Sequence, residues 1–138
     1  MATIVPPIIK LLRRDRRYKL EAYQFVREAL NYAHSELSMG QGLSSNPDDP
    51  AAPEAHVTGQ QLCEAIRLFA TEQFGLMAKL VLNDWGIRST GDFGEIVYNL
   101  IEINEMKKSN SDRREDFDDV YDFDTAFVQE FQISVGKR

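Results

Sequence analysis

Apolar residues recur every three or four positions along most of this chain, with polar residues between them, and this spacing predicts α-helices. The spacing runs through residues 20–37, 59–74, 76–85 and 91–103. Apolar residues at this period line one face of a helix, and that face has to be buried against other helices. We therefore predict a mainly α protein, a single compact domain of four or five helices over residues 1–138.

Signals for helix starts and ends flank these segments. Thr58 and Gln61 have the spacing of a capping box, in which each side chain accepts a hydrogen bond from the backbone of the other residue. Gly75 predicts a break or bend, because glycine disfavours helix interiors. Gly86 followed by Ile87 predicts a Schellman stop, in which a left-handed residue ends the helix.

The period of apolar residues and the start and stop signals together predict two further helices. A short helix is expected after Pro6, because proline is favoured at a helix start. A later helix is predicted to be capped by Ser89 or Thr90 and to end at Asn104, a residue type that tolerates the left-handed conformation. Between the two glycines, the predicted buried stripe consists of Leu76, Met77, Leu80, Val81 and Trp85.

The pattern changes after Asn104, and two predictions stay open for the segment 106–124. One is a small C-terminal β-hairpin, with residues 106–108 as its first strand and a return strand in which aromatic residues alternate with aspartates. The other is helix, because Phe117 and Tyr121 also have a helical spacing. The local structure of residues 117–123 is therefore not decided by the pattern.

A hairpin after three helices would resemble a winged-helix layout, in which residues 91–103 form the recognition helix. That helix carries Asp92, Glu95 and Glu102 and no basic residue. Because it would repel a phosphate backbone, a winged helix of this sequence is expected to contact protein rather than DNA.

Charge is unevenly distributed along the chain. The 138 residues have a net charge of -6, but residues 1–38 hold seven Lys or Arg against four Asp or Glu, and residues 39–138 hold nine against eighteen. An acidic body disfavours broad nucleic-acid binding and leaves a local basic region near the N-terminus. The Gly-, Ser- and Pro-rich residues 40–55 predict a flexible internal linker, and residues 132–138 predict a frayed tail.

A basic cluster is the candidate contact patch for nucleic acid. One interpretation is that it contacts phosphate or RNA, although too few aromatic residues interleave for a base-stacking platform. The favoured interpretation is that its arginines pair with the acidic body, because runs of charge usually pair or are solvated. The cluster consists of Arg13, Arg14, Arg16, Arg17 and Lys19.

An acidic cluster near the C-terminus is the candidate contact patch for a basic partner. Hard cations prefer carboxylate oxygens, but an EF-hand loop is excluded, because the sixth position counted from Asp112 or Asp122 is phenylalanine and not glycine. We assign no metal ligand and expect solvated acids beside buried aromatic residues. The cluster consists of Asp116, Asp118, Asp119, Asp122 and Asp124.

Other reactive residue types give no catalytic arrangement. Cys63 is expected to be a packed small apolar residue, because a nucleophilic cysteine needs a nearby base. His34 and His56, the two histidines, flank the predicted linker and lack metal-ligand spacing. The tripeptide Asp92-Phe93-Gly94 occurs in kinases, but no other kinase motif accompanies it.

Four stretches of the chain resemble a known group of sequences. They are EAYQFVREAL (21–30), HVTGQQL (56–62), EQFGLMAKLVLNDWGIRSTGDFGEIVYNLIE (72–102) and DFDDVYDFDTAF (116–127). In these stretches the chain is similar to the uncharacterised short bacterial protein family restricted to Verrucomicrobia and Planctomycetes. Asn104 stands where related sequences tend to have glycine, which agrees with a left-handed helix end. The resemblance implies a family and no activity.

These observations favour a cytoplasmic protein-interaction or scaffolding module without catalytic activity, because no signal peptide and no catalytic motif is found. The expected partner is another protein, with no membrane contact and no cofactor. Two alternatives stay open: RNA or ribosome association through the basic cluster, and a metal-dependent enzyme that uses Asp118, Asp119 and Asp122. The aromatic residues to test as exposed anchors are Trp85, Tyr98 and Tyr121.

Overall fold

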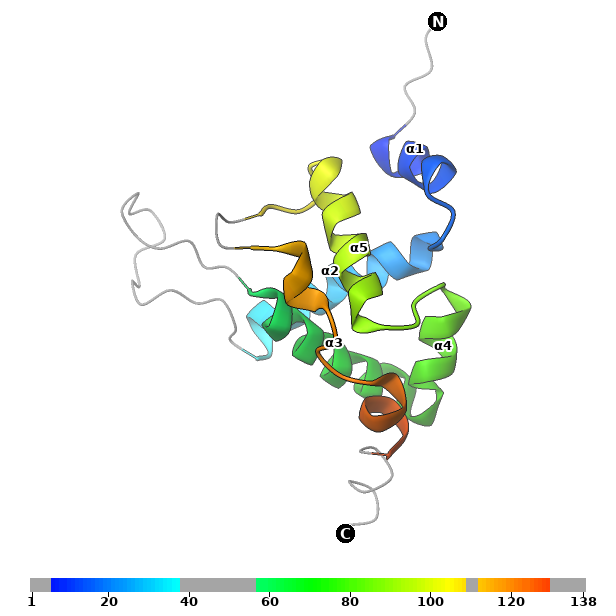
Figure 1. The fold of residues 1–138 in the computed structure, drawn as a ribbon, viewed down its shortest axis with the longest axis vertical. Coiled ribbons are helices and arrows are strands. Elements are labelled where there is room, and N and C mark those ends of the chain that lie inside the picture. Colours follow the sequence, from blue (N-terminus) through cyan, green and yellow to red (C-terminus); the bar gives the residue numbers. More distant parts are fainter. Residues whose placement is uncertain (1–5, 38–56, 109–111, 130–138) are drawn as a thin grey trace, which may run out of the picture.

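The computed structural model describes residues 6–37, 57–108 and 112–129. Within these ranges the chain forms five α-helices and three short helical turns, and no strand (Figure 1). The α-helices are α1 (Pro7–Arg14), α2 (Leu20–Ser35), α3 (Gly59–Phe74), α4 (Ala78–Asp84) and α5 (Thr90–Glu102). The short turns are η1 (Gly75–Met77), η2 (Arg114–Phe117) and η3 (Asp124–Gln129). The prediction of a mainly α fold is confirmed.

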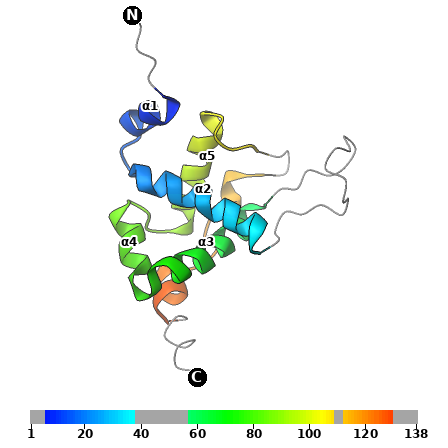
Figure 2. The ribbon, with the colours of Figure 1, turned by 180° about the vertical axis from the view of Figure 1, so that it is seen from behind.

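The core lies between α2, α3 and α5. Helices α2 and α3 lie side by side and run in opposite directions, and α5 packs against both (Figures 1 and 2). The apolar faces predicted from the period of the sequence meet there, because each helix has one such face to remove from water. The largest fully buried side chains include Tyr23, Ile66, Phe93, Ile96, Leu100 and Phe127.

Helix α3 begins as the sequence predicts. The Thr58 hydroxyl accepts a hydrogen bond from the Gln61 N–H at 3.1 Å, and the Gln61 side chain accepts one from the Thr58 N–H at 3.0 Å. This reciprocal arrangement satisfies two backbone donors that the first helical turn leaves without intrahelical partners. The predicted linker (40–55), the predicted tail (132–138) and His56 lie outside the described residues.

Gly86 ends α4 and also allows another segment to approach. Its N–H donates to the Asn83 carbonyl at 3.0 Å, and the Ile87 N–H donates to the Leu82 carbonyl at 2.9 Å, which is the predicted Schellman pattern. Gly86 has a φ of +98°, and a Cβ there would lie 2.0 Å from the Arg17 carbonyl oxygen. Only glycine fits at this crossing of the 15–19 loop, for both steric and conformational reasons.

The helix after Gly86 also has its predicted ends. Ser89 is the N-cap of α5, and Asp92 in the first turn accepts hydrogen bonds from the N–H groups of Arg88 and Ser89 at 2.8 and 3.2 Å. At the other end, Asn104 has a φ of 62°. The Glu105 N–H donates to the Leu100 carbonyl at 2.8 Å, which completes a second Schellman pattern.

The buried stripe predicted for residues 76–85 was wrong at three positions. Leu76, Met77 and Leu80 are exposed, and Ala78 and Leu82 are buried instead. The run is apolar on nearly all sides, so its period does not show which face turns inward. The break at Gly75 sets the rotation of α4, because α3 stops at Phe74 and a 3-10 turn intervenes.

The hairpin considered for residues 106–124 is not supported, because residues 106–108 and 112–124, the part of this range that the structure describes, contain no strand. The described residues of this segment contain the 3-10 turn η2 and an irregular stretch, followed by the π-helix η3. Phe117 and Phe123 are nevertheless buried, and Asp118 and Asp122 are exposed. The segment is held at its middle by the Thr90 hydroxyl, which accepts from the Val120 N–H at 3.1 Å. Burial of the aromatic residues therefore needs no strand.

Candidate ligand pocket and interaction surface

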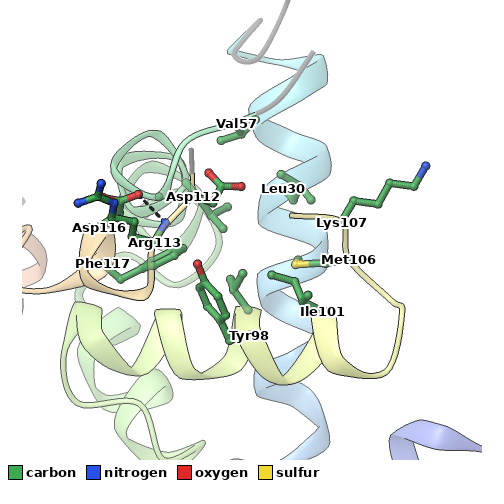
Figure 3. A pocket seen from close by; sticks show the side chains of 13 residues that line it. Leu30, Val57, Tyr98, Ile101, Met106, Lys107, Asp112, Arg113, Asp116 and Phe117 are labelled. Atoms are coloured by element: carbon green, nitrogen blue, oxygen red, sulfur yellow. Dashed lines mark hydrogen bonds between the residues drawn. The ribbon is translucent and has the colours of Figure 1, made fainter. Parts of the chain in front are cut away.

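A hollow lies where the start of α3, one face of α5 and the segment 112–117 meet (Figure 3). Its volume is about 430 Å³, including space that is open to solvent. The surrounding side chains are mostly apolar, with charged groups at the edge, as is common for small-molecule sites. The apolar lining residues are Leu30, Val57, Leu62, Val97, Ile101, Met106 and Phe117. The charged residues at this hollow are Lys107, Asp112, Arg113 and Asp116.

Tyr98 brings a polar atom into this apolar setting. Its hydroxyl oxygen is buried, and no group in the described part of the chain lies within hydrogen-bond distance of it. Burial raises the pKa of Tyr98, and the charges of Asp112, Asp116 and Glu115 raise it further. The hydroxyl is therefore neutral at pH 7, with a donor and acceptor capacity that the described residues do not use.

The charges around the hollow do not point the same way. Figure 3 shows the Asp112 carboxylate and the Tyr98 hydroxyl directed toward the hollow, whereas the Lys107 side chain extends away from it. Asp116 accepts a hydrogen bond from the Arg113 backbone N–H at 3.1 Å, and the Arg113 side chain is exposed. Around the Tyr98 hydroxyl, the charges of the three carboxylates raise its pKa and that of the Arg114 guanidinium lowers it by less.

The three exposed apolar side chains of η1 and α4 form a separate feature, which we name the apolar face. The exposed fractions are 55% for Leu76, 53% for Met77 and 61% for Leu80. They are the only large hydrophobic side chains among the described residues that are exposed to this degree. Apolar side chains that gather on one exposed surface mark interaction sites more often than isolated ones do.

The basic cluster is largely paired within the chain. Arg14 forms an ion pair with Glu102 at 2.7 Å, and Lys19 forms one with Asp84 at 3.3 Å. Arg17 pairs with Asp15 at 2.7 Å. Arg13 and Arg16 are exposed, and the described residues offer them no ion pair. Three of the five residues of the basic cluster are therefore paired with carboxylates of the same chain.

Beside this cluster lies a polar seam, formed by Asp15, Tyr18, Tyr23, Asp92 and Asn99. The Tyr18 hydroxyl donates to Asp92 at 2.6 Å, and the Asn99 amide donates to Asp15 at 3.0 Å and to the Tyr23 hydroxyl at 3.2 Å. The hydrogen bonds from Arg17 hold the pKa of Asp15 well below its usual range. Each side chain of the polar seam therefore has a partner.

The acidic cluster does not converge on one point. Asp118 pairs with Arg114 at 2.9 Å, and Asp124 pairs with Lys79 of α4. Asp122 accepts from the Thr125 N–H at 3.1 Å and so caps η3, while Asp119 is exposed with a φ of 50°. Among the described residues, no three His, Cys, Asp or Glu side chains lie together as metal ligands would.

The remaining candidate residues have structural roles. Cys63 is fully buried, and burial raises the pKa of its thiol to about 12, so it is not a nucleophile at neutral pH. Trp85 is half-buried against Phe25 at a ring-centroid distance of 5.5 Å. The Tyr121 hydroxyl donates to the Cys63 carbonyl at 2.7 Å. Of the three aromatic residues proposed as anchors, only Tyr98 borders the hollow.

Sequence reasoning missed two features of these sites. Tyr98 was named as an aromatic residue to inspect, but nothing in the sequence indicates that its hydroxyl lacks a partner. The apolar face was assigned to the core, and the only available signal was that residues 76–82 contain more apolar residues than a seven-residue helix can bury.

Comparison with known proteins identifies no family for this chain. No family model, no curated protein and no solved structure matches the chain. Within the described ranges, every helix is too short or too polar to cross a membrane. The inferences below therefore depend on the residues themselves.

Proposed function

We propose that this protein is an interaction module that binds a basic amphipathic helix of another protein on its apolar face. The observation that carries the proposal is the exposure of Leu76, Met77 and Leu80, each by more than half. Complete burial of a side chain of this size contributes about 1.5–3 kcal/mol. Burial of all three side chains by one partner therefore supplies a substantial part of the free energy needed for specific binding.

The spacing of the three residues suits a helical partner. Leu76 and Leu80 are four positions apart, and Met77 and Leu80 are three apart, which places the exposed side chains in one ridge along η1 and the first turn of α4. Ridges of this kind pack into the grooves of another helix. Lys79 is turned to Asp124 of η3 instead, so its charge is already compensated within the chain.

The charge around the apolar face favours a basic partner. Glu72 lies four positions before Leu76, and Asp122 lies two positions before η3, which packs on η1 and α4. Both are exposed acids, whereas Asp84 and Asp124 are paired with Lys19 and Lys79. Residues 39–138 carry nine basic against eighteen acidic side chains. A helix with lysine or arginine beside its apolar stripe complements this surface, whereas a second copy of the chain would bring like charges together.

The proposal is tested with a labelled model helix that has a leucine stripe flanked by lysines. Its affinity is measured by fluorescence anisotropy for the native chain and for the triple variant Leu76→Ser, Met77→Ser, Leu80→Ser. We expect the dissociation constant to rise at least about tenfold in the variant, since two or more buried side chains are lost. The control variant Gln24→Ser, Asn31→Ser changes exposed polar residues of α2 and is expected to bind as the native chain does.

Two results would contradict the proposal. One is equal affinity of the native chain and the triple variant for the model helix. The other is a stable dimer of the native chain in sedimentation experiments that the triple variant does not form, because the apolar face would then belong to a second copy. A matched peptide with glutamates in place of lysines checks the charge argument and is expected to bind at least about tenfold more weakly.

Association with RNA or the ribosome through Arg13 and Arg16 is the alternative that keeps some support, because both side chains are exposed. Each phosphate contact makes affinity depend on salt. The variant Arg13→Gln, Arg16→Gln is expected to weaken binding to an RNA oligonucleotide and to reduce its salt dependence; binding that is insensitive to salt removes this alternative. Membership in the Verrucomicrobia and Planctomycetes family stays a prediction, as does the metal-dependent enzyme.

A further inference from the structure

The hollow beside Tyr98 gives the chain a second property that does not depend on the proposed function. We propose that it binds a small uncharged carbonyl compound, whose hydrocarbon body lies on the floor of the hollow and whose carbonyl oxygen accepts a hydrogen bond from the Tyr98 hydroxyl. The apolar face lies on η1 and α4, which contribute no residue to the lining of the hollow. The two sites can therefore be tested separately.

The floor of the hollow accounts for the hydrocarbon body. The side chains that form it come from three elements: Leu62 of α3, Val97 and Ile101 of α5, and Phe117 of η2. These elements pack on one another, so the fold itself forms the floor. Apolar pockets with few polar groups are the usual form of small-molecule sites. A compact hydrocarbon group is therefore the part of a ligand that this floor would bury.

The Tyr98 hydroxyl accounts for one polar group on the ligand. It is directed toward the hollow (Figure 3), and within the described ranges nothing lies at hydrogen-bond distance from its buried oxygen. A buried hydroxyl without a partner costs stability, and native structures contain few of them. By contrast, the Tyr121 hydroxyl is bonded to the Cys63 carbonyl at 2.7 Å. The unused hydroxyl therefore indicates that its partner comes from outside the described chain.

The protonation state of Tyr98 identifies the missing partner as an acceptor. Burial is the largest cause that raises the pKa of this hydroxyl, so the group keeps its proton at neutral pH. Its O–H is thus a donor that the described residues leave unused. Among backbone groups in folded proteins, buried donors are left without a partner more rarely than buried acceptors are. A carbonyl oxygen, which accepts hydrogen bonds and donates none, is the group that meets this need.

The charges around the hollow favour an uncharged ligand, because those near Tyr98 already have partners. Asp116 accepts a hydrogen bond from the Arg113 N–H at 3.1 Å, and Asp112 also has an interaction partner. Arg114 forms ion pairs with two carboxylates, at 2.9 and 3.2 Å. A charged ligand would lose its water in this hollow without gaining an unpaired charge of opposite sign, which is costly. An uncharged carbonyl compound avoids this cost.

The experiment is a titration of the full chain with acetophenone, an uncharged aryl ketone, followed by backbone amide shifts in nuclear magnetic resonance spectra. Three analogues keep the ring and a planar substituent of similar size: α-methylstyrene has a methylene group in place of the carbonyl oxygen, benzoate is the anion and benzamidinium is the cation. We expect shifts at residues 97–101 and 113–117. The affinity for acetophenone is expected to be about fivefold or more above that for α-methylstyrene, since only the ketone accepts the hydrogen bond. Both ions are expected to bind more weakly than acetophenone.

Paired variants separate the hydroxyl from general packing. Tyr98→Phe keeps the ring, and it is expected to weaken binding of acetophenone about fivefold and to leave that of α-methylstyrene unchanged, so that the preference for the ketone disappears. Tyr121→Phe removes a bonded hydroxyl elsewhere and is expected to keep the preference. The triple variant of the apolar face is also expected to keep it, so failure of the proposed function leaves this test intact.

Four outcomes would overturn the inference. The first is equal affinity for acetophenone and α-methylstyrene, which would mean that the hollow takes up any apolar ring. The second is a preference for the ketone that persists in Tyr98→Phe, and the third is tighter binding of benzoate or benzamidinium than of acetophenone. The fourth is an absence of shifts at the lining residues for all four compounds, in which case water or another part of the chain occupies the space beside Tyr98.

Discussion

Helix α5 meets polar groups on two of its sides. On one side, Asp92 and Asn99 join the polar seam, where Tyr18 and Asp15 provide hydrogen bonds at 2.6 and 3.0 Å. On the other side, the Tyr98 hydroxyl is buried beside the hollow without a partner among the described residues. Both tyrosine hydroxyls are shielded from water, but only that of Tyr18 has a carboxylate at hydrogen-bond distance.

This contrast separates a structural region from a candidate site. Polar groups that satisfy one another contribute to stability and leave no capacity for a ligand. A polar group without a partner costs stability, and a ligand that provides the missing bond recovers that cost. The polar seam is therefore expected to lose stability when it is altered, whereas the hollow is expected to lose ligand affinity and little stability. The four predictions below test this difference.

The largest effect on stability is expected at Gly86, where the 15–19 loop next to the polar seam crosses the end of α4. Gly86→Ala puts a Cβ 2.0 Å from the Arg17 carbonyl oxygen and forces an unfavourable φ, so the 15–19 loop has to move. The free energy of unfolding is expected to fall by about 3 kcal/mol or more, as measured by urea denaturation.

Gly91→Ala is the matched control for this substitution. A Cβ at Gly91 would meet its neighbours at 3.4–3.5 Å, which is ordinary contact, and the site lies in the first turn of α5. Its stability is expected to be unchanged or to rise by up to about 1 kcal/mol, since alanine favours helix. Equal effects of the two substitutions would contradict the role assigned to Gly86.

Next in size is the hydrogen bond between Tyr18 and Asp92. Tyr18→Phe removes the hydroxyl donor and leaves one carboxylate oxygen without its buried partner. A hydrogen bond to a charged group contributes about 1.5–3 kcal/mol, and a loss of about 2 kcal/mol in the free energy of unfolding is expected. A double-mutant cycle with Asp92→Asn measures the coupling; a value below about 0.5 kcal/mol would show that the hydroxyl contributes mainly by packing.

A smaller effect, dependent on pH, is expected from Asp15. Because Arg17 lowers its pKa in the folded chain, Asp15 stabilises the fold above the pKa of an unfolded aspartate, which is about 3.9. This contribution is lost as the pH falls through the lower folded pKa. The stability advantage of the native chain over Asp15→Asn is thus expected to be constant from pH 7 to about 5 and to shrink below about 4. Urea denaturation across this range measures it, and an advantage that grows at low pH would contradict the assignment.

The smallest effect on stability is expected at Tyr98. Tyr98→Phe removes a hydroxyl that has no partner in the described chain, so the free energy of unfolding is expected to change by less than about 0.5 kcal/mol or to rise. Tyr121→Phe removes a bonded hydroxyl and is expected to cost about 1 kcal/mol. Thermal unfolding of the two variants compares them directly. A larger loss at position 98 than at position 121 would mean that Tyr98 has a structural partner.

Much of the fold follows from short-range signals in the sequence. The capping box at Thr58, the stop at Gly86 and the left-handed end at Asn104 each depend on a few neighbouring residues, and all three are found. The periods of α2, α3 and α5 identify their buried faces for the same reason. Signals of this kind need no knowledge of the rest of the chain.

Features that depend on contacts distant in sequence were not predictable. Helix α4 is short and almost uniformly apolar, so its rotation depends on the break at Gly75 and on its packing against α3. Residues 112–124 bury their aromatic side chains without a strand, because η2 packs on α5, about twenty residues earlier. Whether Tyr18 or Tyr98 has a hydrogen-bond partner depends on residues from other segments, and no local pattern reports this.

The reactivity of the buried Cys63 thiol reports transient opening of the fold. Cys63 is the one cysteine of the chain, and its carbonyl receives the hydrogen bond from Tyr121 of the C-terminal segment. A thiol reagent can modify it only in molecules whose C-terminal segment has detached or whose core has unfolded. The rate of modification in native buffer therefore measures how often the fold opens around Cys63 by either route, without any added label.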